Sequence, residues 1–186
     1  SDVCSSDLNS SVDPTDIVNI VGTVVSLPKA VQDRLGLENF STEDIQVGDL
    51  AIFSHQVIYN FIEQVEGADP VYRNRIWHEG NEYFLADINH IYGVIRGEEI
   101  IMINDYVMLR PFQESKLVLG ASARLIKGTV KCQVMHIGKP LKNHKPIEAK
   151  QGDWAYFNPS VAVKYQINNK PFVIVSQSNI FGVEAE

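Results

Sequence analysis

The chain contains an internal repeat, in which three short blocks occur twice in the same order. The first set is residues 22–25 (Gly-Thr-Val-Val), 47–53 (Val-Gly-Asp-Leu-Ala-Ile-Phe) and 91–94 (Ile-Tyr-Gly-Val), and the second is residues 128–131 (Gly-Thr-Val-Lys), 151–157 (Gln-Gly-Asp-Trp-Ala-Tyr-Phe) and 180–183 (Ile-Phe-Gly-Val). Such an ordered echo indicates a tandem duplication of one small domain. We therefore expect two domains, at residues 9–103 and 104–186.

The apolar pattern predicts strands and turns in both copies. Stretches rich in β-branched and aromatic residues are bounded by Gly, Asn, Asp or Pro, at residues 18–27, 50–61, 99–109, 125–137 and 171–175. Gly48-Asp49 and Gly152-Asp153 each precede an apolar strand, where glycine supplies a positive φ and aspartate bonds the amides of the turn. We expect an all-β protein of two tandem, partly open β-barrels that share this corner.

Composition and charge exclude several classes of function. The 186 residues are 45% hydrophobic and carry a net charge of −7, with a pI near 5.2. Proteins that bind nucleic acids instead gather Lys and Arg into clusters. The sequence also lacks an apolar run of about 18 residues that would span a bilayer, and its first residues do not resemble a secretory signal. We expect a cytoplasmic protein that binds neither nucleic acid nor membrane.

The sequence contains no pattern typical of a catalytic or metal site. The chain has five histidines, which are His55, His78, His90, His136 and His144. Their spacing fits neither a His-x-x-x-His pair nor a His-Cys pair of the kind that binds a metal ion. Cys4 and Cys132 form no disulfide framework. Neither a Gly-x-Ser-x-Gly elbow nor a phosphate-binding loop occurs. We expect no enzyme activity, no cofactor and no metal.

Three segments differ from the repeated pattern. Residues 1–8 resemble translated sequencing adapter, which we interpret as non-native, although an ordinary polar N-terminus is the alternative. Residues 54–82 replace the short connection 158–170 of the second copy, and we expect an enlarged hairpin or surface loop there. Residues 139–150 are polar and contain two prolines, which predicts an exposed loop.

The second copy resembles the ten-kilodalton co-chaperonin family, the GroES-like lids of chaperonin cages. The resemblance runs through the opening strand 106–112, the apolar tip 117–120 of a mobile loop, Gly-Thr-Val at 128–130, Gln-Gly-Asp at 151–153 and the closing strand 180–186. The first copy matches only from residues 16–25 onward, so we expect it to be incomplete at its N-terminus. The mobile loop is shorter than the family's and has Ser115-Lys116 in place of paired glycines.

The resemblance implies a GroES-like barrel in each copy and a co-chaperonin function without catalysis. Leu117, Val118 and Leu119 would dock a chaperonin-60 (GroEL-like) ring, which encloses client proteins, and the chain would form a homo-oligomer. The implied subunit interface joins Tyr106, Val107 and Leu109 of one subunit to Ile180, Phe181 and Val183 of the next.

Two alternatives stay open. Residues 117–119 also fit an inward-facing barrel strand. The chain also fits a structural or adaptor β-barrel protein, for instance from a virus, that self-assembles without docking a chaperonin. Because the first copy lacks its opening strand, we expect these 186 residues to assemble poorly.

Overall fold

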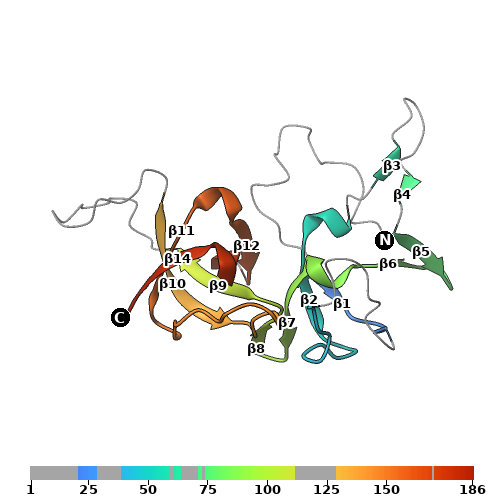
Figure 1. The fold of residues 1–186 in the computed structure, drawn as a ribbon. Coiled ribbons are helices and arrows are strands. Elements are labelled where there is room, and N and C mark those ends of the chain that lie inside the picture. The colour runs from blue at the N-terminus through green and yellow to red at the C-terminus, as the bar shows by residue number, and fades with distance from the viewer. Residues whose placement is uncertain are drawn as a thin grey trace.

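The structure is a computed structural model. It describes residues 21–28, 39–58, 61–63, 71–72, 74–111, 129–168 and 170–186. These residues form strands, short 3₁₀ turns and loops, and they contain no α-helix (Figure 1). The expected all-β class is confirmed. The closure of each half into a partly open barrel stays a prediction.

Two main sheets organise the described residues, one in each half of the chain. The four-stranded sheet consists, in spatial order, of β1 (Val21–Thr23), β2 (Leu50–Phe53), β7 (Ile91–Arg96) and β8 (Glu99–Met102). The six-stranded sheet consists, in spatial order, of β12 (Val163–Ile167), β13 (Lys170–Ser176), β9 (Tyr106–Pro111), β10 (Val130–Ile137), β11 (Trp154–Phe157) and β14 (Ile180–Glu184). All strand pairs in both sheets are antiparallel.

Two hairpins and four 3₁₀ turns complete the described structure. The hairpins are β3 (Phe61–Glu63) with β4 (Val71–Tyr72) and β5 (Arg75–His78) with β6 (Asn81–Phe84). The turns are η1 (His55–Val57), η2 (Ile88–His90), η3 (Pro159–Val161) and η4 (Gln177–Asn179). The expected excursion at 54–82 thus contains η1, β3, β4, β5 and part of β6. The side chain of Asn74 anchors it, because its amide donates to the carbonyls of Val57 (2.6 Å) and Leu85 (2.9 Å).

The two Gly-Asp corners have the same geometry, as predicted. In the first corner, Val24 N donates to Asp49 O (2.8 Å) and Gly48 N donates to Val24 O (2.8 Å). Both glycines have positive φ, +97° at Gly48 and +101° at Gly152. The same two bonds recur at Val134, Gly152 and Asp153, with lengths of 2.8 and 2.9 Å.

The strand pairs behind the corners also share one register. Ala51 lies opposite Val94, as Ala155 lies opposite Val183, and a register shift follows just before the phenylalanine in both ladders. The first strand of each ladder, however, is matched differently in the structure than the repeated Gly-Thr-Val blocks predict. Gly22 lies opposite Ala51 and Cys132 lies opposite Ala155, so Gly22 matches Cys132 and not Gly128.

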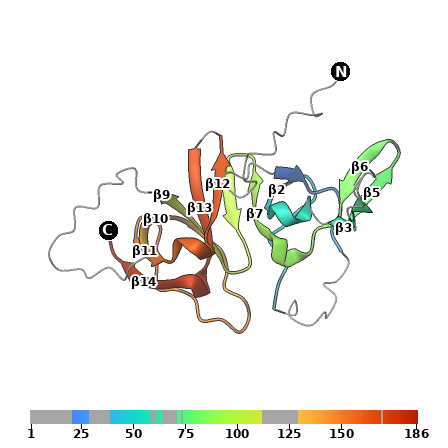
Figure 2. The same cartoon turned by 90° about the horizontal axis from the view of Figure 1, so that it is seen from above.

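Three apolar clusters form the core. One cluster lies in the first half and includes Val94 and Ile103, and another lies in the second half and includes Val107 and Leu109. The third cluster spans both halves, and its buried members are Ile52, Tyr92, Met102, Met108, Tyr165, Ile167 and Ile174. Figure 2 shows β7 of the first half next to β12 and β13 of the second. Burying a large apolar side chain contributes about 1.5–3 kcal/mol, so this shared cluster fastens the halves together.

Candidate interaction surfaces

The four-stranded sheet ends in a hairpin with a tight turn. Arg96 at the end of β7 pairs with Glu99 at the start of β8, which leaves only Gly97 and Glu98 in the turn. Gly97 has φ of +62°, a conformation that glycine adopts without steric cost. Because β9 follows β8 directly, this hairpin carries the chain from one main sheet into the other.

Tyr106 lies at the contact between the halves within the chain. Its hydroxyl donates to Asn89 O (2.9 Å), and its ring meets the ring of Tyr92 edge-on, with centroids 4.8 Å apart and planes at 77°. Burial, with smaller effects from Tyr92 and Asp105, raises the pKa of Tyr106 to about 12. The neutral hydroxyl therefore persists as a hydrogen-bond donor at neutral pH.

The other two predicted interface residues of the opening strand lie in the core of the second half. Val107 and Leu109 are fully buried. β9 pairs with β10 on one side and with β13 on the other. The expected pairing of residues 106–112 with a final strand of another barrel therefore finds no free edge on β9. The closing strand of the first half, β7, instead pairs with β2 on one edge and with β8 on the other.

β14 carries Ile180, Phe181 and Val183 and forms the end of the six-stranded sheet. Among the described residues it pairs with β11 alone, so its second edge is open. Phe181 is 59% exposed and Val183 is 37% exposed, whereas Ile180 packs partly buried against the core. Open strand edges with exposed apolar side chains are sites where further strands add.

Residues 117–119 lie outside the described residues, but both ends of their connection are described. β9 ends at Pro111, which lies opposite Cys132 on β10. The segment 112–128 therefore leaves from and returns to two adjacent antiparallel strands at one end of the sheet. Residues 139–150, the predicted exposed loop, expose most of their polar side chains.

A cluster of aromatic and charged side chains lies beside the open edge. The ammonium of Lys131 sits 4.9 Å from the ring centroid of Trp154 and 5.4 Å from that of Tyr156, and it pairs with Glu184 at 2.7 Å. Tyr156 also donates its hydroxyl to Glu184. The bond from Lys131 lowers the pKa of Glu184, and the same bond raises the pKa of Lys131. These contacts hold a paired charge on the outer face of β11 and β14.

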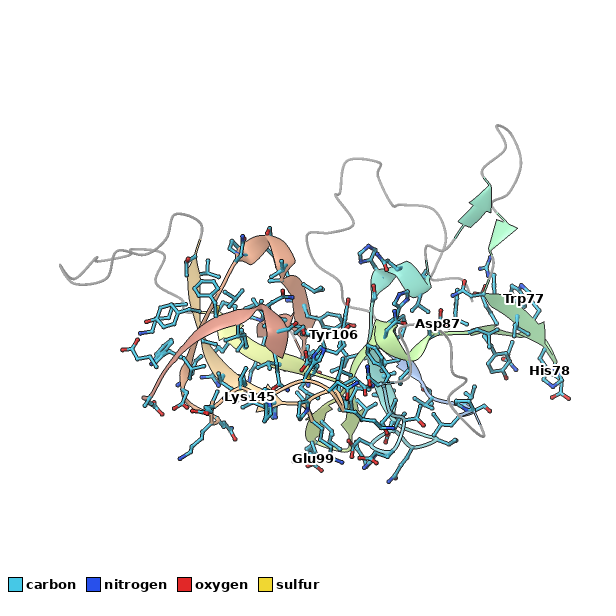
Figure 3. All side chains as sticks on the ribbon, in the orientation of Figure 1. Trp77, His78, Asp87, Glu99, Tyr106 and Lys145 are labelled. Atoms are coloured by element: carbon cyan, nitrogen blue, oxygen red, sulfur yellow. The ribbon has the colours of Figure 1, made fainter. Side chains whose placement is uncertain are left out.

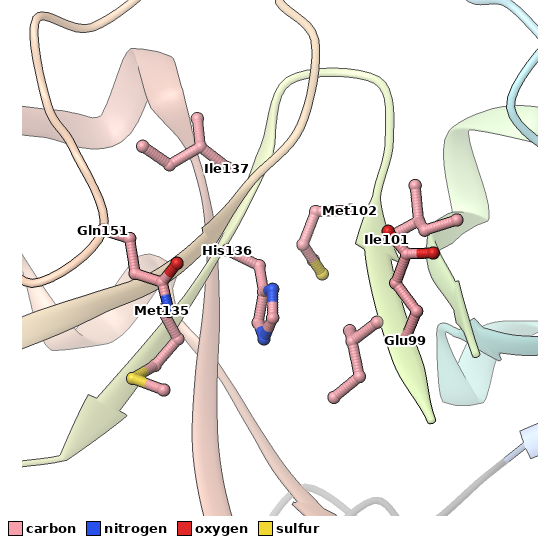
Figure 4. A pocket seen from close by; sticks show the side chains of 8 residues that line it. Glu99, Ile101, Met102, Met135, His136, Ile137 and Gln151 are labelled. Carbon is pink, nitrogen blue, oxygen red and sulfur yellow. The ribbon is translucent and has the colours of Figure 1, made fainter. Parts of the chain in front are cut away.

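A pocket of about 370 Å³ lies between β8 and β10. It is lined by Glu99, Ile100, Ile101, Met102, Met135, His136, Ile137 and Gln151 (Figure 4). Burial lowers the pKa of His136, and the charge of Glu99 opposes that shift.

Among the described residues, no three His, Cys, Asp or Glu side chains gather as a metal ion would require. No helix in the described part of the chain has the length and apolarity to cross a bilayer.

The sequence interpretation missed the residues that join the halves. Ile52, Tyr92 and Met102 are buried between the two sheets, although they were read only as parts of strands. One signal for this contact was present in the sequence. Gly97-Glu98 separates two β-branched runs by two residues, a spacing typical of a β-hairpin.

The comparison with protein families agrees with the all-β fold. Residues 99–184 match the family model of the chaperonin 10 kDa subunit. The match begins at β8 and ends at β14, so it contains the whole six-stranded sheet. A search of curated proteins finds no match to the chain. Residues 99–184 are therefore similar to the chaperonin 10 kDa subunit family.

Proposed function

We propose that this chain is a co-chaperonin that caps a chaperonin-60 ring and assists the ATP-dependent folding of client proteins. The family match over residues 99–184 carries the proposal. The ATP chemistry belongs to the chaperonin, and the chain contributes a binding surface. Clients are affected indirectly, because the cap encloses the space in which they fold.

Docking is assigned to Leu117, Val118 and Leu119, an apolar triplet in the connection between β9 and β10. Each aliphatic side chain contributes about 1.5–3 kcal/mol if it is fully buried in a groove of the partner. Ordering a segment on binding costs about 2–5 kcal/mol, so one loop binds weakly. Several loops presented together bind a multi-subunit ring by avidity.

Oligomer formation is part of the proposal, because a ring partner is capped by several loops at once. The open edge of β14 and the exposed Phe181 and Val183 support it.

The test compares binding and stability in the same double variant, Val118→Ser with Leu119→Ser. We expect this variant to lose co-sedimentation with an assembled chaperonin ring in ATP or ADP and to keep its unfolding midpoint. The matched control replaces two exposed valines, Val47→Ser with Val161→Ser, and keeps both properties.

A large drop in stability for the loop variant would place residues 117–119 in a core strand, where truncations cost about 2–5 kcal/mol each. If the unaltered chain fails to bind any chaperonin ring, the structural or adaptor function replaces the proposed one.

A further inference from the structure

A buried carboxylate with an incomplete set of partners lies where the chain passes from the first half to the second. Asp105 comes directly before β9 and is 2% exposed. Its Oδ2 accepts a hydrogen bond from the hydroxyl of Ser176 at 2.5 Å. Its Oδ1 is buried and has no hydrogen-bond partner among the described residues. Because a buried carboxylate is costly unless it is hydrogen-bonded or paired with a cation, this side chain has room for one more interaction.

The backbone on both sides holds Asp105 at this junction. Asn104 and Asp105 have φ of +50° and +74°, a conformation that residues other than glycine rarely adopt. The amide of Asp105 donates to Lys139 O (2.8 Å), and its carbonyl accepts from Gln177 N (2.7 Å). These bonds fix the position of the turn, so a further partner for the carboxylate has to come from a neighbouring segment.

The loop 139–150 supplies that partner. Nδ1 of His144 lies 3.6 Å from Oδ2 of Asp105, and the His144 side chain is 42% exposed. This separation is longer than a hydrogen bond. A neutral imidazole carries a proton on one nitrogen, whereas the imidazolium donates from both. Among the ion pairs of the described residues, the contact with His144 is the one that Asp105 makes.

The other titratable groups near this pair are already partnered or exposed to water. The Lys139 ammonium contacts Glu43 (2.8 Å) and Asp44 (2.9 Å) of the first half. The hydroxyl of Tyr106 donates to Asn89 O. η4, which packs on the other side of Asp105, carries no titratable side chain. The remaining charged groups of the loop are exposed, and they are Lys142, Lys145, Glu148 and Lys150. The buried carboxylate is therefore left to His144.

We infer that His144 is a pH-operated latch, whose imidazolium pairs with the buried carboxylate of Asp105 and fastens the loop 139–150 to the junction between the halves. Imidazole is the side chain that ordinarily changes charge between pH 5 and pH 8. The same loop reaches the first half through Lys139 and through Asn143, whose amide donates to Asn39 Oδ1 at 3.0 Å. The latch therefore also strengthens the contact between the halves as the pH falls. It is a property of the fold and does not depend on the proposed function.

The test compares urea unfolding of the unaltered chain and His144→Gln at pH 8 and at pH 5.5. A group that holds its proton more tightly in the folded state adds stability as the pH falls. We therefore expect equal unfolding constants at pH 8. At pH 5.5 the constant of His144→Gln should be about tenfold larger, because a hydrogen bond from a charged group to a buried carboxylate is lost.

His78→Gln is the matched control. Nε2 of His78 lies 3.8 Å from Oε1 of Glu79, but the two side chains are 72% and 81% exposed. Figure 3 shows His78 at the far end of the first half, away from Lys145, the residue that follows His144. Exposed ion pairs contribute little to stability, so the unfolding constant of His78→Gln should match that of the unaltered chain at both pH values.

The variant Asp105→Asn identifies the partner of His144, because it keeps the shape of the side chain and removes its charge. His144→Gln added to Asp105→Asn should give no pH-dependent difference. If Asp105→Asn does not fold, hydrogen exchange of the Ile147 amide, which donates to Gln177 Oε1 at 3.1 Å, provides the second measurement. After correction for the intrinsic exchange rate, its protection should rise at pH 5.5 in the unaltered chain and not in His144→Gln.

Three results would overturn the latch. One is an unfolding constant of His144→Gln whose ratio to that of the unaltered chain does not change with pH. Another is an equal change for His78→Gln, which would mean that burial of the carboxylate has no role. The third is a pH-dependent effect of His144→Gln that persists beside Asp105→Asn, since the imidazolium would then pair with a different group.

Discussion

Tyr92 on β7 and Phe181 on β14 occupy matching places in two ladders of the same register, yet Tyr92 is 7% exposed and Phe181 is 59% exposed. The ladders differ in what lies beyond them. β7 is followed by β8 and by the cluster that includes Met108 and Ile174, whereas β14 ends the sheet. The same local structure is therefore core in one half and surface in the other. How much a side chain of either ladder contributes to the free energy of unfolding thus depends on what packs against that ladder.

The corners show the same contrast in polar groups. Asp49 is buried, and Arg96 donates to both of its carboxylate oxygens at 2.8 Å. Asp153 accepts a bond from the amide of Lys150 (2.8 Å) and a long one from Glu186 N (3.4 Å). Both aspartates fix the turn, since Gln46 N donates to Asp49 at 2.7 Å. Among the described residues, the first corner alone adds an ion pair, between Arg96 and Asp49.

Truncation of the matched aromatic residues, Tyr92 and Phe181, should give the largest difference between the halves in lost free energy of unfolding. Tyr92→Ala removes a buried ring that packs against Tyr106, and we expect a loss of about 3–5 kcal/mol. Phe181→Ala removes an exposed ring, and we expect a change within about 0.5 kcal/mol. Urea unfolding at a concentration where the chain is monomeric measures both. Similar losses for the two variants would mean that β14 is covered within the chain.

The ladders could be predicted from the sequence because their determinants are local. The Gly-Asp pair and the alternation of apolar residues act over a few positions, so Asp49 and Asp153 were identified as the same corner. The register of the first strand was not predictable from the Gly-Thr-Val echo. Val24 binds the corner, and this longer-range contact sets the pairing of Gly22.

Which side chains pack against each ladder also depends on residues that are distant in the sequence. Ile52 is fully buried in a cluster that includes side chains of β9, β12 and β13, which come much later in the chain. The pattern of β2 alone cannot reveal that contact. For the same reason, Val107 and Leu109 were assigned to a subunit interface, although pairing on both sides of β9 places them in the core.

The matched glycines should give the next largest difference. Gly93→Ala would place a Cβ 2.7 Å from the backbone of β8, which cannot move freely, and we expect a loss of about 1–3 kcal/mol. Gly182→Ala meets its nearest neighbour at 3.7 Å, an ordinary contact, so its stability should change by less than about 0.5 kcal/mol. Thermal unfolding of the two variants tests this comparison. Self-association of Gly182→Ala should nevertheless weaken, because a second strand would meet the new methyl group.

The smallest expected effect is a difference in acid sensitivity between the corners. The hydrogen bonds from Arg96, followed by the bond from Gln46 N and the charge of Arg96, lower the pKa of Asp49 against the opposing effect of burial. A carboxyl with a lowered pKa stabilises the fold above its unfolded pKa of about 3.9, and that contribution disappears as the pH falls through the lower folded value. Asp49→Asn keeps one acceptor oxygen but loses the charge, so we expect a loss of about 1 kcal/mol at neutral pH.

Thermal unfolding from pH 7 to pH 3 follows that difference. The gap in melting temperature between the unaltered chain and Asp49→Asn should stay constant down to about pH 4 and narrow below it, because protonated Asp49 no longer pairs with Arg96. Asp153→Asn is the matched control. The described partners of the Asp153 carboxylate are the backbone amides of Lys150 and Glu186, and an asparagine at this position can still accept the bond from Lys150 N. A gap for Asp49→Asn that is independent of pH would show that shape rather than charge makes the first corner the stronger one.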